Sequence, residues 1–210
     1  MKKFELTSET KINIFGKKLF RIKALISFAD VEAGETGGWV EKEGNVNQSG
    51  NAWVYGDAEV SGDAKVYGNA EVYGDAMVYG DAKVYGDAEV SGNAKVYGDA
   101  KVYGDAMVSG DAKVSGDAEV SGNAKVYGDA MVYGDAMVYG DADYTTIHGF
   151  GTQFRTTTFF RCKDKKVRVA CGCFFGTIPE FREQVKNTRK GKIAEEYLMI
   201  ADLMENHFEK

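Results

Sequence analysis

The side chains best suited to chemistry in this 210-residue chain are basic ones gathered near its C-terminus. Residues 150–192 contain eleven lysines and arginines against three acidic residues, although the whole chain has a formal net charge of -6. Guanidinium and ammonium groups bind phosphates and carboxylates by charge-assisted hydrogen bonds, and a phenylalanine ring can stack on a base. We therefore predict a site for an anionic small molecule, with a nucleotide as the first candidate, at Arg155, Arg161, Lys163, Lys166, Arg168, Arg182, Lys186 and Phe160. A solvated surface, or one docked on the acidic middle of the chain, is the alternative.

Groups suited to catalysis or metal binding are sparse. The three cysteines have the spacing C-x8-C-x-C, which lacks a second C-x-x-C pair, whereas a structural zinc ion takes four ligands. Their odd number is typical of reduced thiols. The histidines, His148 and His207, both lie outside the regular part of the sequence. We predict no catalytic residue, no cofactor and no metal, and we expect the three cysteines to be buried and to pack a hairpin.

The element that must position the basic cluster is a six-residue repeat, Gly-Asp/Asn-Ala-x-Val-Tyr/Ser, between Gly50 and Asp141. Alternate side chains of a strand point to opposite faces, so alanine and valine share one face while the variable and Tyr/Ser positions share the other. Gly-Asp and Gly-Asn are turn signals. Each unit therefore predicts a short strand and a sharp corner, and stacked units bury a continuous column of alanine and valine.

This pattern resembles the hexapeptide-repeat left-handed β-helix, as in Val66-Tyr67-Gly68-Asn69-Ala70-Glu71. The resemblance covers residues 36–142 and implies a mainly β protein whose left-handed parallel β-helix has three hexads per coil. Residues 18 apart would then stack at about 4.8 Å in three outer columns. Acyltransferases of this fold use a histidine base and its carbonic anhydrases use several histidines, yet residues 50–141 contain none. An acyltransferase is therefore only the second alternative function.

The flanks of the repeat predict two further parts. Residues 1–35 are expected to form a cap around a hairpin that turns at Gly16. Residues 143–210 are expected to form a basic ββαα module that docks on the last coil. Its strands are predicted over 156–162 and 166–171, and its first helix starts at the capping-box pattern Thr177-Ile178-Pro179-Glu180. Gly191 is expected to separate the two helices.

The outer columns of the repeat predict a surface for self-association. One column stacks tyrosines beside lysines and a methionine, and we expect an oligomer face at Tyr67, Tyr85, Tyr103, Tyr139 and Met137. A trimer is favoured because the hexapeptide-repeat enzymes that the chain resembles are commonly trimers. The alternative is a ladder that only stiffens the wall of the prism.

The whole chain also resembles hexapeptide-repeat proteins of gut bacteria and their prophages, through Gly37-Gly38-Trp39-Val40-Glu41, residues 50–55 and residues 171–177. This resemblance implies a phage accessory role. Our leading hypothesis is a non-enzymatic binding protein that sequesters a nucleotide signal, and the first alternative is a self-assembling scaffold. We expect a cytoplasmic protein, since no membrane segment or secretory signal is evident, and we expect neither a membrane nor a nucleic acid as a partner.

Overall fold

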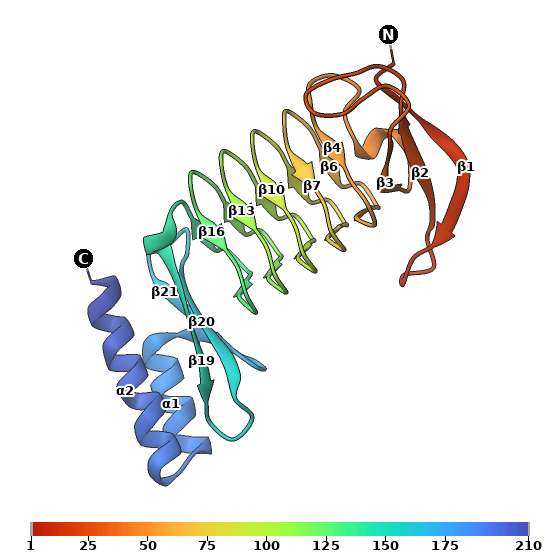
Figure 1. Cartoon of the computed structure of the whole chain (residues 1–210). Helices are drawn as coiled ribbons and strands as arrows, with labels where there is room; N and C mark the ends of the chain where they lie inside the picture. The colour runs from red at the N-terminus through yellow and green to blue at the C-terminus, as the bar shows by residue number, and fades with distance from the viewer. Residues whose placement is uncertain (1, 210) are drawn as a thin grey trace.

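The computed structural model describes residues 2–209 and shows a rod with a different element at each end (Figure 1). A parallel β-solenoid of about 6 turns forms the rod. An antiparallel β-hairpin covers its N-terminal end, and a module of four strands and two helices covers its C-terminal end. The mainly β, parallel coiled architecture is confirmed, while the left-handed sense stays a prediction from the resemblance.

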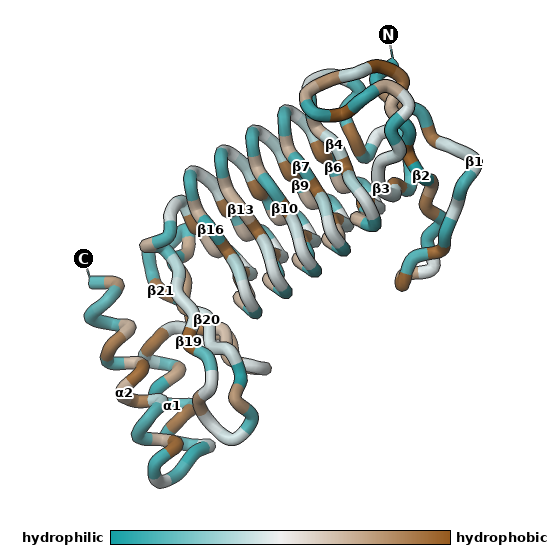
Figure 2. Tube along the Cα trace, viewed as in Figure 1, coloured by the Kyte–Doolittle hydropathy of each residue, from teal (hydrophilic) through white to brown (hydrophobic). Residues whose placement is uncertain are grey.

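Each coil of the solenoid consists of three two-residue strands separated by corners. Strands pair with strands one coil away in parallel, and the register joins Trp53 to Glu71 and Lys65 to Lys83, residues 18 positions apart. Three hexads therefore make one coil, as predicted. Alanine and valine side chains of the repeat are fully buried along the axis, and Figure 2 shows this periodic apolar character along the rod.

Three sheets form the three faces of the prism. The first face contains β3 (Thr36–Val40), β5 (Glu59–Val60), β8 (Met77–Val78), β11 (Lys95–Val96), β14 (Lys113–Val114) and β17 (Met131–Val132). The second contains β4 (Trp53–Val54), β7 (Glu71–Val72), β10 (Glu89–Val90), β13 (Met107–Val108) and β16 (Lys125–Val126). The third contains β6 (Lys65–Val66), β9 (Lys83–Val84), β12 (Lys101–Val102), β15 (Glu119–Val120) and β18 (Met137–Val138).

The corners need glycine for two separate reasons. Gly86 has a φ of +76°, a left-handed conformation that other residues rarely adopt. A Cβ atom there would also lie 2.9 Å from the backbone nitrogen of Gly104 in the next coil. The glycine therefore permits both the sharp corner and the close stacking of one corner on the next.

The N-terminal cap is a hairpin of β1 (Phe4–Ile12) and β2 (Lys18–Ala24). The short 3-10 helix η1 (Glu43–Asn45) comes after β3. The hairpin turns at Gly16, whose φ is +74°, as predicted. β2 pairs antiparallel with β3, and β3 pairs in parallel with β5. The hairpin thus extends the first face and covers the edge that an open solenoid would expose.

The C-terminal module contains β19 (Tyr144–Phe150), β20 (Arg155–Arg161), β21 (Val167–Cys171) and β22 (Phe174–Thr177), preceded by η2 (Asp141–Asp143). The two predicted strands correspond to β20 and β21, so β19 and β22 extend the predicted hairpin to a four-stranded antiparallel sheet. Helices α1 (Ile178–Thr188) and α2 (Gly191–Phe208) pack on this sheet. α1 has the predicted capping box between Thr177 and Glu180.

The module docks on the last coil, as predicted. Phe160 is fully buried in the apolar cluster of the solenoid, and Cys162 bridges to Ala136. The Phe175 ring lies 4.6 Å from that of Tyr133, centroid to centroid. One continuous core therefore joins the module to the rod.

Candidate functional site

Ion pairs within the chain occupy most of the predicted basic cluster. Their partners are acidic residues of the module and of the last coils. Most of these partners are distant in the sequence, whereas Asp164 lies four residues before Arg168. Arg182 contacts Asp202 and Glu205, Arg168 contacts Asp164, Arg161 contacts Asp143, and Lys163 contacts Glu119. The Asp202 and Glu205 carboxylates also raise the pKa of the Arg182 guanidinium. These side chains therefore hold the module together more than they offer charge to a ligand.

Phe160 requires a correction. Its ring was expected to stack on a ligand, but the side chain is fully buried and packs between the module and the solenoid. A buried ring has no free face for a base, so Phe160 is a core residue. Lys166 lies instead in a hollow of about 430 Å³ beside Arg161, where the lining also includes Glu205 and Glu209. Lys186 is exposed on α1, and no hollow includes it among the described residues.

Arg155 has a different environment from the rest of the cluster. Two adjoining hollows, of about 290 and 160 Å³, lie between the β19–β20 loop, the β21–β22 turn and the end of α1. Both are lined by Arg155, Arg189, Tyr197 and Cys171, and we call them together the arginine pocket. Within residues 2–209, no carboxylate lines this pocket or pairs with either arginine.

Two glycines with left-handed backbones shape the arginine pocket. At Gly172, with a φ of +59°, an added Cβ would overlap the Arg155 guanidinium. At Gly151, with a φ of +73°, a Cβ would lie 2.5 Å from the Tyr197 hydroxyl oxygen. The Tyr197 hydroxyl donates to the carbonyl of Phe150 at 3.2 Å. The Arg155 guanidinium and the Tyr197 hydroxyl thus lie close to the backbone of these two glycines.

The three cysteines are free thiols in distinct settings, and the prediction that all three are buried is wrong, because only Cys162 is buried. Cys162 is buried, and burial raises the pKa of its thiol to about 11. Cys171 is half-buried, and its sulfur accepts a hydrogen bond from the Thr157 hydroxyl at 3.1 Å. Cys173 is exposed and lines the arginine pocket beside Cys171. Two of the three cysteines therefore belong to the candidate site.

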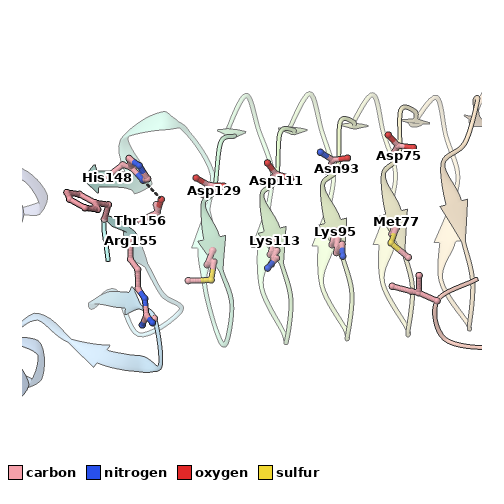
Figure 3. A pocket seen from close by; sticks show the side chains of 14 residues that line it. Asp75, Met77, Asn93, Lys95, Asp111, Lys113, Asp129, His148, Arg155 and Thr156 are labelled. Atoms are coloured by element: carbon pink, nitrogen blue, oxygen red, sulfur yellow. Dashed lines mark hydrogen bonds between the residues drawn. The ribbon is translucent and has the colours of Figure 1, made fainter. Parts of the chain in front are cut away.

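A second hollow extends from Arg155 along the first face of the solenoid (Figure 3). This groove has a volume of about 710 Å³. Lys95 and Lys113 lie side by side on its floor, since their strands pair in register. Asp75, Asp111 and Asp129 form a row along one corner in Figure 3, and Ile14 and Phe154 line the groove from the two end elements. Both charges are present in the lining of this groove, whereas the lining of the arginine pocket has arginines and no carboxylate among the described residues.

The histidines, acids and thiols of residues 2–209 form no metal-binding cluster. No set of three His, Cys, Asp or Glu side chains is placed to hold a metal ion within that range. His148 Nδ1 lies 3.0 Å from the Thr156 hydroxyl at the end of the groove. His207 packs edge-on against Phe208 at the far end of α2. The two histidines therefore lie in different parts of the module and do not form one site.

The predicted oligomer face is the third face of the solenoid. Tyr67, Tyr85 and Tyr103 stack with centroid distances of 4.8 and 4.9 Å and nearly parallel planes. Tyr139, exposed by 48%, lies on the same face beyond Ser121. Lys101 pairs with Glu119 at 3.2 Å, and Lys163 extends this network from the module. The column is therefore a regular aromatic ladder, and its role in assembly stays a prediction.

Sequence reasoning missed Arg189 and Tyr197 as pocket residues. Tyr197 has the helical spacing of a core residue, and it is in fact 7% exposed. Its hydroxyl nevertheless reaches the pocket edge. Arg189 follows α1 directly, in a run of basic residues where nothing in the sequence distinguishes it. The packing of α1 on β21 and β22 brings Arg189 to Arg155, and the packing of α2 on β19 brings Tyr197 there.

Comparison with known proteins supports the repeat and nothing finer. One protein-family model, the YdcK beta solenoid repeat, matches residues 100–116, about one coil. No curated protein matches the chain at a significant level. Within residues 2–209, neither helix has the length and apolar character needed to cross a membrane.

Proposed function

We propose that this chain is a non-enzymatic binding protein in which the β-solenoid carries a module that binds a small anionic ligand at the arginine pocket. One observation carries the proposal. Arg155 and Arg189 line a concave site without a carboxylate among the described residues, whereas Arg161, Arg168 and Arg182 are paired with acids. A guanidinium group without an internal partner keeps its hydrogen-bond donors for a ligand.

The other hollows offer a weaker case for an anion. The groove of the first face includes three aspartates, and the hollow beside Lys166 includes two glutamates. Carboxylates at a site repel a phosphate or carboxylate, and this repulsion is strong at short range. The arginine pocket is therefore the hollow whose charge best fits the ligand class.

A nucleotide is the first ligand to test. Arginine binds phosphate oxygens through two parallel hydrogen bonds, which suits a terminal phosphate. Aromatic rings of Phe150, Tyr197, Phe174 and Phe181 line the two hollows and offer apolar surface near the arginines. The two hollows, of about 290 and 160 Å³, each lie below the range of about 300–1,000 Å³ that is usual for ligand sites. A mononucleotide or a dinucleotide lying partly in solvent is thus the appropriate size class.

Calorimetry against a panel of nucleotides and inorganic phosphate tests the proposal. We expect binding by the wild-type protein and at least about tenfold weaker binding by Arg155→Met or Arg189→Met, since each loses a charge-assisted contact. Lys186→Met is the matched control, because it removes an exposed charge outside the hollows. A folded protein that binds no member of the panel, or a Lys186→Met variant as weak as the arginine variants, contradicts the proposal.

The resemblance to prophage proteins gives this activity a biological setting. A phage accessory protein that binds a host nucleotide signal would lower its free concentration without a chemical step. The alternative function, a self-assembling scaffold, is supported by the stacked tyrosines of the third face. The two roles are compatible, because the third face and the arginine pocket use different residues.

A further inference from the structure

We propose that the arginine pocket also captures small anionic disulfides by forming a mixed disulfide at Cys173. The inference rests on the proposed function, since the same arginines would select the ligand by its carboxylates. It goes beyond that function because it assigns a covalent step to a thiol. The observation behind it is that two thiols and two arginines without carboxylate partners line a single hollow in the described chain.

The β21–β22 turn places the thiols next to the guanidinium. Cys171 ends β21, Gly172 forms the turn and Cys173 precedes β22. Arg155 packs on Gly172 so closely that a Cβ there would overlap its guanidinium nitrogen. A carboxylate held by Arg155 is therefore held beside the turn that carries both sulfurs.

Burial and hydrogen bonding single out Cys173 as the reacting thiol. Cys162 is buried against the last coil, and burial raises its pKa to about 11. Cys171 is half-buried, and its sulfur already accepts a hydrogen bond from Thr157. Cys173 is exposed at the pocket. Because exchange requires in-line access to the attacking sulfur, the exposed thiol is the reactive one.

The step is an ordinary thiol–disulfide exchange. The Cys173 thiolate attacks one sulfur of the ligand disulfide, forming a new S–S bond as the ligand S–S bond breaks. The leaving sulfur takes the bonding electron pair and then the proton that Cys173 released. One ligand half stays on the protein and the other departs as a thiol, so the ligand disulfide is the oxidant and nothing else is consumed.

Charge selectivity separates this proposal from the general reactivity of an exposed thiol. An anionic disulfide gains a contact with Arg155 and Arg189 before exchange, whereas an uncharged disulfide gains none. Electrostatic attraction of this kind raises association rates by about tenfold or more and weakens with salt. We therefore divide each rate by the rate of the same reagent with a free thiol. On this scale the wild-type protein should react faster with the anionic reagent than with the uncharged one.

The experiment measures adduct formation by intact-mass spectrometry with three reagents: oxidised glutathione (anionic), hydroxyethyl disulfide (uncharged) and cystamine (cationic). We expect one adduct, mapped to Cys173, lost in Cys173→Ser and kept in the matched variant Cys162→Ser. In Arg155→Met/Arg189→Met we expect about a tenfold slower reaction with oxidised glutathione and an unchanged rate with hydroxyethyl disulfide. The single variant Arg189→Gln, at an exposed position after α1, gives the same comparison if the double variant fails to fold.

The outcomes are distinguishable from those of the proposed function. Adducts at Cys162, no adduct, or arginine variants that slow all three reagents equally overturn the covalent inference. Calorimetry of Cys173→Ser with nucleotides tests non-covalent binding separately, because that variant retains both arginines. Nucleotide binding without charge-selective exchange leaves the function standing and this inference overturned. Charge-selective exchange without nucleotide binding supports the pocket's anion selectivity and rejects the nucleotide.

Discussion

The ammonium group of Lys3 donates to the carbonyl oxygen of Ala52 at 2.7 Å, and this contact closes one corner of the first coil. In the solenoid, an N–H of one coil donates to a C=O of the next, as from Lys83 to Ala100 at 2.9 Å. The first coil therefore presents carbonyls that no earlier coil can satisfy. Lys3 also reaches the carbonyl of Gly50, and Asn45 donates to those of Gly62 and Ala64.

The opposite end has the opposite chemistry. The last coils present N–H groups without a following coil, and oxygen acceptors cover them. The backbone N–H of Met131 donates to the Thr158 hydroxyl at 3.0 Å. The backbone N–H groups of Lys125 and Tyr139 donate to the carboxylates of Asp141 and Asp143, respectively. The caps thus supply hydrogen-bond donors at the N-terminal end of the rod and acceptors at its C-terminal end. This is the reverse of an α-helix, whose N-terminal N–H groups are capped by acceptors.

Lys3 makes stability depend on pH in a defined direction. Burial lowers the pKa of Lys3 from 10.5 to about 8. Between these values the unfolded state binds more protons than the folded state, so the free energy of unfolding rises with pH. We expect Lys3 to contribute at most about 3 kcal/mol of increase between pH 8 and 10.5, and no change below pH 8.

Urea unfolding of the wild-type protein and of Lys3→Met across this pH range isolates the contribution of Lys3 to the pH dependence of stability. All other titrating groups are present in both proteins, so their contributions cancel in the difference. The wild type should gain stability relative to Lys3→Met as the pH rises. Lys2→Met, the control at an exposed position, keeps Lys3 and should gain stability relative to Lys3→Met as the wild type does. A stability difference between wild type and Lys3→Met that is constant over the range is incompatible with a buried charged amine.

The amide of Asn45 supplies a second test of the N-terminal cap. Asn45→Asp keeps the shape but replaces the donor to Gly62 and Ala64 by an oxygen that faces two carbonyls. Since the side chain is fully buried, we expect a loss of about 1–3 kcal/mol in the free energy of unfolding. Asn51→Asp is the matched control, because this corner position is exposed and most other hexads carry aspartate there. Equal unfolding midpoints for the two variants would argue against the cap.

The repeat could be predicted in detail because each hexad encodes its own strand and corner. Val66 and Gly68 need only their neighbours and an identical unit 18 residues away, so the register follows from the sequence alone. The arginine pocket has no such code. Arg155, Arg189 and Tyr197 meet through the packing of both helices on the sheet, α1 on β21 and β22 and α2 on β19. The partners that neutralise Arg182 are 20 and 23 residues away. Charge density in the sequence therefore located the module and included Arg155, but it could not distinguish the arginines that lack an acidic partner from those that are paired.

Alanine variants of two corner glycines distinguish the cost of a left-handed backbone from the cost of steric overlap. Gly86 and Gly128 have similar positive φ values, +76° and +65°, but only Gly86 has a neighbouring coil within 4 Å of an added Cβ. Gly128→Ala should lose about 1 kcal/mol from the left-handed backbone alone. Gly86→Ala should lose more, by about 1–3 kcal/mol, because the alanine methyl meets the Gly104 backbone.

Thermal or urea unfolding of the two variants makes the comparison, and far-UV circular dichroism checks that both retain the solenoid. Equal losses would show that the close stacking of corners contributes little to the requirement for glycine.

The tyrosine ladder of the third face leads to a prediction about assembly. If this face joins subunits into the trimer that the resemblance favours, light scattering should give about three times the chain mass of 22.9 kDa. Tyr85→Glu places a charge in the middle of the stack, between rings 4.8 and 4.9 Å apart, and should yield monomers. Tyr97→Glu disturbs the equivalent stack on the first face, where the rings of Tyr79 and Tyr97 are 5.0 Å apart, and should leave the trimer intact. A wild-type monomer at high concentration, or dissociation by both variants alike, would contradict assembly through the third face and leave the ladder as a stiffener of the wall.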